Sequence, residues 1–153
     1  MEYVRLGRTN LLISRVGFGA MSLEKLSSDQ ESYSLIRSAY DRGINFFDIS
    51  RQKAKGEVLL GESIGDIRKN VIVATKSCAS TKEELLNDIE TSLTALKTDY
   101  IDLFQYESNS FVPEAADSSG IIEALLKVQS EGKIKHIGFA TEDFDLAVKA
   151  VNL

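Results

Sequence analysis

Short apolar segments recur along this 153-residue chain, and between them apolar residues are spaced three or four apart. Continuous apolar runs of this length predict buried strands, whereas the wider spacing predicts helices with one buried face. Five such strands are predicted, at residues 15–20, 44–49, 70–76, 100–106 and 133–140. A helical segment follows each of them, so the order is strand, helix, strand, helix to the end of the chain.

Capping residues help to locate the starts of these helices. Ser28 with Glu31, and Ser80 with Glu83, have the spacing of a capping box, in which each side chain bonds the backbone N–H of the other residue. Thr141 is predicted to cap the last helix. The helix after Ser80 has an unbroken apolar stripe that we expect to be buried; it consists of Leu85, Leu86, Ile89, Leu93 and Leu96.

A small β-hairpin is predicted before the first of these strands. The runs "YVRL" and "LLIS" are separated by "GRTN", whose residue types suit a tight turn. We therefore expect a hairpin over residues 3–14, followed by βα units over residues 15–153.

Strands that alternate with helices indicate right-handed βαβ units and a parallel sheet, either open and doubly wound or part of a (β/α)8 barrel. A dinucleotide-binding open sheet would place G-x-G-x-x-G after its first strand, but "GFGAMS" has no third glycine. Asp48, Lys76 and Glu107 instead end three successive strands, where barrels place their catalytic groups. The predicted fold class is α/β of the (β/α)8 TIM-barrel type, with only about the first five βα units in a single partial domain over residues 1–153.

Composition narrows the classes of function. The net charge is −5 and the pI about 5.0, which argues against a nucleic-acid partner, because phosphate binding needs a basic surface. One cysteine and one histidine make a protein-built metal site improbable. The N-terminal "MEYVRLGRTN" lacks the apolar segment of a signal peptide, and nowhere do 18 apolar residues run together. We expect a cytoplasmic protein with no membrane partner.

Several motifs, in order, resemble those of the aldo-keto reductase family. They are "LGRTNLLISRVGFGAMS", "GINFFDIS", "GEVLLGE", "VIVATK", "LKTDYIDLFQ" and "EGKIKHIGFA". The stretch from "TKEELLNDIE" to "EGKIKHIG" is especially similar to the branch often fused to a ferredoxin-like C-terminal region. The resemblance spans essentially the whole chain and implies a barrel enzyme of about twice this length.

The resemblance implies reduction of small aldehydes and ketones with NADPH, using an Asp, a Tyr, a Lys and a His. In the family the Tyr donates a proton to the carbonyl oxygen, the Lys paired with the Asp lowers the pKa of the Tyr, and the His orients the substrate. Asp48 and Lys76 match the family Asp and Lys. Lys53 occupies the position of the Tyr, and Glu107 that of the His.

The cofactor contacts implied by the resemblance fall on the ends of three strands. They are Gly19, Ala20, Asp48, Ala140 and Thr141. Ala140 stands where the family usually has Ser or Thr near the nicotinamide amide. Most other cofactor contacts in the family come from strands six to eight, which lie outside these 153 residues.

Three hypotheses follow from these departures. The chain can be a reductase in which Glu107 orients the substrate and Lys53 is the only candidate proton donor, although we predict little or no activity for the chain alone. It can instead be an inactive pseudoenzyme or a half-barrel module that self-associates through its strand edges. It can also be part of a longer protein. The non-catalytic alternative for these four residues is an ion-paired quartet, in which Asp48 and Glu107 pair with Lys53 and Lys76. We expect Tyr106 to point to the opposite side of its strand.

Overall fold

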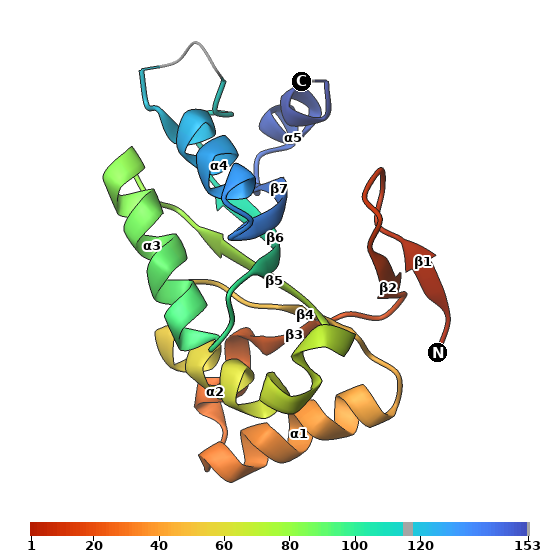
Figure 1. The fold of residues 1–153 in the computed structure, drawn as a ribbon. Coiled ribbons are helices and arrows are strands. Elements are labelled where there is room, and N and C mark those ends of the chain that lie inside the picture. Colours follow the sequence, from red (N-terminus) through yellow and green to blue (C-terminus); the bar gives the residue numbers. More distant parts are fainter. Residues whose placement is uncertain (115–117, 153) are drawn as a thin grey trace.

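The structure is a computed structural model that describes residues 1–114 and 118–152 (Figure 1). The strands are β1 (Tyr3–Arg5), β2 (Leu12–Ser14), β3 (Phe18–Gly19), β4 (Phe46–Asp48), β5 (Ile72–Ser77), β6 (Ile101–Glu107) and β7 (Ile134–Ala140). The α-helices are α1 (Asp29–Asp41), α2 (Ala54–Ile64), α3 (Lys82–Ala95), α4 (Ile121–Ser130) and α5 (Phe144–Val151). Two 3-10 helices are η1 (Ala20–Lys25) and η2 (Gly65–Asn70).

The main sheet has five parallel strands in the order β3-β4-β5-β6-β7. A doubly wound sheet reverses its strand order at a switch point, whereas consecutive strands of a barrel lie side by side. The unbroken order therefore confirms the barrel type over the open sheet. In Figure 1 helices α1 to α4 lie on one side of this sheet, away from the hairpin. The sheet forms only part of a barrel, and β3 and β7 are its edges.

Side chains alternate between the two faces of the sheet, as the pleat requires. Phe47, Val73 and Phe104 point toward the helices and are fully buried. The apolar stripe predicted for α3 packs against them: Leu85, Ile89, Leu93 and Leu96 are buried and Leu86 is partly buried. The opposite face receives the side chains of Asp48 and Lys76, which are only partly buried.

The predicted hairpin is present, because β1 and β2 pair antiparallel. Asn45 fastens it to the start of β4: its Oδ1 accepts the Ser14 N–H at 2.6 Å, and its Nδ2 donates to the Leu12 carbonyl at 3.0 Å. Within the described residues no helix is long and apolar enough to cross a membrane.

The residues that cap α1, α3 and α5 differ in part from the predicted ones. Ser28 does accept the Glu31 N–H, but the Glu31 carboxylate bonds the N–H of Ser27 instead of Ser28. The last helix is capped by Asp143, not by Thr141.

At α3 the predicted pair is displaced by one residue. Thr81 is the N-cap and accepts the Glu84 N–H at 3.2 Å, while Glu84 accepts the Ser80 N–H at 2.8 Å. Two hydroxyl residues and two glutamates stand next to each other here, so spacing alone cannot decide which pair caps the helix.

Candidate functional site

Asp48 and Lys76 form the centre of the candidate site, at the carboxyl ends of β4 and β5. The Lys76 Nζ lies 3.1 and 2.9 Å from the two carboxylate oxygens of Asp48 and 3.1 Å from the carbonyl oxygen of Ile49. An ammonium group has three N–H donors, so these acceptors use all of them. The Lys76 side chain is 12% exposed and that of Asp48 is 36% exposed. Water therefore reaches the carboxylate more easily than the ammonium group.

The sheet places these two side chains together. Asp48 is in register with Ala74, two residues before Lys76 on β5. Residues two apart on a strand share a face, so the carboxylate and the ammonium group project from the same face of neighbouring strands. The expected contact between Asp48 and Lys76 is therefore present.

Lys53 lies at the N-cap of α2 and bonds a different partner from the expected ones. Its Nζ pairs at 2.9 Å with Oε1 of Glu24, in η1 after β3. The expected quartet of Asp48, Lys53, Lys76 and Glu107 is therefore wrong. Glu24 was missed because it is distant in sequence, and only the adjacency of β3 and β4 brings their following segments together.

Glu107 ends β6, in register with Ala140 of β7. Its side chain is partly buried, and no hydrogen bond or ion pair of its carboxylate occurs within the part of the chain that the structure describes. Tyr106 points the other way, as predicted, and is buried. Its hydroxyl donates to the carbonyl oxygen of Ala79 at 3.2 Å, which makes it unsuitable as a substitute proton donor.

The residues expected to contact a cofactor differ in what surrounds them. Gly19 is in register with Asp48, and a Cβ at Gly19 would meet no atom within 4 Å, so this end of β3 is open. Ala20 is fully buried. The Thr141 hydroxyl donates to Oδ1 of Asn109 at 2.9 Å and accepts the N–H of Asp143 at 3.0 Å. Cofactor binding by all five of these residues, Gly19, Ala20, Asp48, Ala140 and Thr141, stays a prediction.

Glu57 is a polar residue near the site that the sequence did not single out. It is fully buried in α2, and its carboxylate accepts the hydroxyls of Thr75 and Ser92, each at 2.8 Å, and pairs with Arg51. Burial raises the pKa of Glu57 above its ordinary value, although the bonds from Ser92, Thr75 and Arg51 oppose this rise. A signal was available, because Glu57 shares one helix face with the buried Gly61, where an acid is unusual.

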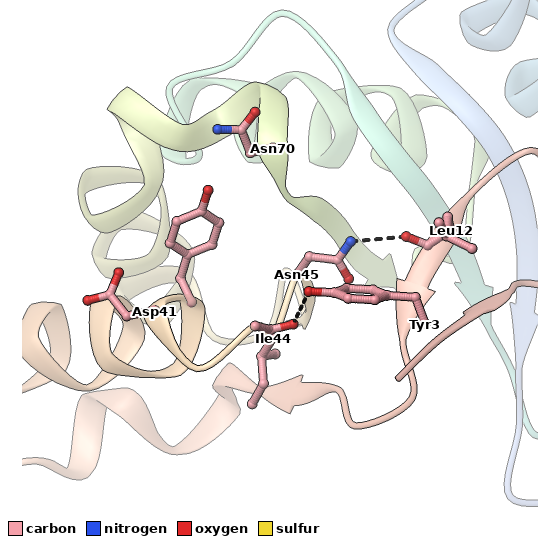
Figure 2. Close-up of a pocket in the computed structure, with 8 residues that line it drawn as sticks. Tyr3, Leu12, Asp41, Ile44, Asn45 and Asn70 are labelled. Carbon is pink, nitrogen blue, oxygen red and sulfur yellow. Dashed lines mark hydrogen bonds between the residues drawn. The ribbon is translucent and has the colours of Figure 1, made fainter. Parts of the chain in front are cut away.

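A large pocket lies away from this site, beside the hairpin (Figure 2). It has a volume of about 550 Å³ and lies between Tyr3 and Leu12 of the hairpin and the residues before β4. Two of its lining residues are joined directly, because the Tyr3 hydroxyl donates to the Gly43 carbonyl at 2.9 Å. Because these residues precede β4, the pocket opens at the end of the sheet opposite Asp48 and Lys76.

Comparison with known proteins gives a consistent match. The sequence profile of the aldo/keto reductase family matches residues 15–152. The chain is 30% identical to the uncharacterized oxidoreductase YqkF of Bacillus subtilis, over 92% of this chain and 49% of that protein. It is 32% identical to L-galactose dehydrogenase of Arabidopsis thaliana, over 95% of this chain and 50% of that protein. The chain thus spans about half the length of the curated relatives it matches.

Solved structures agree on the fold. An aldo-keto reductase of Bacillus halodurans, in its holo form, superposes with a TM-score of 0.87 at 24% identity, over 99% of this chain and 54% of that chain. A thermostable aldo-keto reductase in complex with the inhibitor epalrestat gives a TM-score of 0.83 at 26% identity. The five-stranded sheet with its helices is therefore the arrangement found in part of such barrels.

Proposed function

Because this chain belongs to the aldo/keto reductase family, we propose that it supplies the Asp48 and Lys76 part of an NADPH-dependent site that reduces small aldehydes or ketones. The observation that supports the proposal is the Lys76 ammonium group, which contacts both carboxylate oxygens of Asp48 at the carboxyl edge of the sheet. We also propose a cytoplasmic location, which is consistent with the free thiol of the single cysteine, Cys78.

The site residues divide the work between charge and proton transfer. Asp48 holds the Lys76 ammonium group in place. The positive charge of Lys76 stabilises the negative charge that develops on the carbonyl oxygen of the substrate during reduction. NADPH, when bound, supplies the hydride. The open space beside Gly19 is compatible with this cofactor, and Ala140 and Thr141 would contact it at the carboxyl end of β7.

The chain has no tyrosine at the position of the proton donor. Lys53 occupies the donor position but pairs with Glu24 at 2.9 Å, so it must leave this partner before it can reach a substrate. Glu107 would orient the substrate, because its carboxylate makes no hydrogen bond or ion pair within the described residues. We therefore expect the 153-residue chain to oxidise NADPH very slowly or not at all with a panel of aldehydes. Steady oxidation that disappears in Lys76→Met would contradict this expectation.

A fusion tests the positive part of the proposal. The chain is joined to the part of the Bacillus halodurans reductase that it does not cover, in order to supply the rest of the barrel. Lys53→Tyr in this fusion should raise the rate of carbonyl reduction by about 10²-fold or more, the usual contribution of a positioned general acid. Lys76→Met should abolish the gain. If Lys53→Tyr changes nothing in a fusion that folds and binds NADPH, the proposed role of this site is wrong.

A second candidate function is self-assembly of the half-barrel. Large apolar side chains are exposed beside both sheet edges: Val16 (56%) and Met21 (43%) flank β3, and Phe144 (79%) and Val151 (79%) lie on α5 after β7. A twofold axis along the barrel axis would place β7 of one copy beside β3 of the other, with the strands still parallel. Light scattering should then show a dimer that Phe144→Glu dissociates. A stable monomer would exclude this candidate.

A further inference from the structure

The two residues on either side of Lys76 are polar and buried on the helix side of the sheet. Thr75 is fully buried and Ser77 is 1% exposed. Inner positions of parallel strands are usually apolar, because both faces are covered, and a buried hydroxyl without a partner is costly. The carboxyl end of β5 therefore depends on polar partners from the helices.

Two carboxylates from different helices supply these partners. The Thr75 hydroxyl donates to Oε1 of Glu57 in α2 at 2.8 Å, and the Ser77 hydroxyl donates to Asp88 in α3. The alternation of the strand places the Lys76 side chain on the opposite face, and these two bonds hold the residues on either side of it against the helices.

Glu57 also holds the segment that follows Asp48. Its carboxylate pairs with the Arg51 guanidinium group, whose side chain is 13% exposed, and the Arg51 N–H donates to the Lys76 carbonyl oxygen at 2.9 Å. The same segment contains the Ile49 carbonyl, one of the three acceptors of the Lys76 ammonium group. One buried carboxylate therefore connects both sides of the candidate site.

We propose that Glu57 is a positioning residue for the Asp48–Lys76 pair, acting through Thr75 on β5 and through Arg51 on the segment after β4. This inference rests on the proposed function, since the position of Lys76 matters for chemistry only if the pair serves carbonyl reduction. It assigns Glu57 no contact with substrate or cofactor.

A purely structural role makes a different prediction. Glu57 also accepts the Ser92 hydroxyl of α3 at 2.8 Å, so it can be seen simply as a link between two helices. Ser92 and Thr75 donate to the same oxygen at the same distance, and both are fully buried. Ser92→Ala and Thr75→Val therefore form a matched pair, and only Thr75 adjoins Lys76.

The test observes the Lys76 ammonium group directly by ¹⁵N NMR of the intact chain at low temperature. An ammonium group with three acceptors exchanges its protons slowly enough to give a signal, and Lys76→Met identifies that signal by its loss. Thr75→Val removes the bond from β5 to Glu57, and Glu57→Gln keeps an acceptor for Thr75 but removes the charge that binds Arg51. Either change should loosen one of the three acceptor contacts of the Lys76 ammonium group, so its exchange rate should rise about fivefold, which corresponds to about 1 kcal/mol, the net contribution of one hydrogen bond. Ser92→Ala should leave the rate unchanged while it lowers the melting temperature.

The outcomes separate this proposal from the proposed function. An unchanged rate in both Thr75→Val and Glu57→Gln, an equal rise in Ser92→Ala, or no Lys76 signal in the wild type would each overturn the positioning role. Because the measurement needs no turnover, an inactive fusion with the expected exchange rates would reject the reductase and leave the positioning of Lys76 established.

Discussion

Gly61 lies where α2 crosses the end of α3, one helical turn after Glu57, and it offers a sharp test of this packing. A Cβ at this position would lie 2.6 Å from the carbonyl oxygen of Ala95, 2.6 Å from the Cα of Leu96 and 2.7 Å from the carbonyl carbon of Leu96. All three are backbone atoms, so no side-chain rotation can relieve the overlap. Gly61→Ala must push α3 away from α2.

The magnitude follows from this geometry. Added atoms in a packed interior cost about 1–3 kcal/mol, and the upper end applies here because a whole helix must shift. For a chain of about 150 residues, 1 kcal/mol changes the melting temperature by roughly 2–4 °C. We therefore expect Gly61→Ala to melt roughly 6–12 °C below the wild type.

Gly65 provides the matched control, four residues later at the end of the same helix. Its backbone is right-handed helical, with φ −51° and ψ −46°, and a Cβ would meet no atom within 4 Å. Gly65→Ala should raise stability by about 0.4–1 kcal/mol, because alanine restricts the unfolded chain. Thermal unfolding followed by circular dichroism measures both variants. Equal melting temperatures for Gly61→Ala and Gly65→Ala would refute the close approach of α2 and α3.

Three other predictions concern polar contacts. Burial raises the pKa of Glu57 above 4.5, so between pH 4.5 and this raised pKa the folded state binds more protons than the unfolded state. The free energy of unfolding should therefore fall as the pH rises through this window. Urea unfolding should show this pH dependence in the wild type and not in Glu57→Gln. A hydrogen bond to Glu62 raises the pKa of Tyr33 to about 12, and Glu62→Gln should return the ionisation seen by ultraviolet titration toward 10.0. Asn45→Ala should cost about 1–2 kcal/mol, since two hydrogen bonds to the hairpin are lost, and should speed proteolysis of residues 1–14.

Much of the fold was predictable because the responsible signals are local. Alternating apolar runs and helical stripes gave the order of strands and helices, and the missing third glycine favoured a barrel over an open sheet. The contact between Asp48 and Lys76 was also predictable, since each residue ends a strand and consecutive strands of a barrel are neighbours. The family motifs agreed with this reading.

Other features depended on contacts between residues distant in the sequence. Glu24 and Lys53 are 29 residues apart, and Glu57 and Ser92 are 35 apart. Long side chains on adjacent loops can choose among several partners of opposite charge, so composition alone did not exclude the quartet that the structure contradicts. Cap positions were displaced for a related reason, because neighbouring hydroxyl residues compete for the same helix end.

The sequence by itself therefore determined the order of the secondary structure and the carboxylate–lysine pair, because these follow from periodicity and from residues at strand ends. It also indicated the family, through the resemblance of several motifs in order. Only the tertiary structure decided that the Lys53 ammonium group bonds Glu24. It also decided that Glu57, on the helix side of the sheet, bonds both β5 and the segment after Asp48. The physical reason is that long charged side chains, and buried carboxylates above all, pair with the groups that the packed helices and strands bring near them, and these groups are neighbours only in three dimensions.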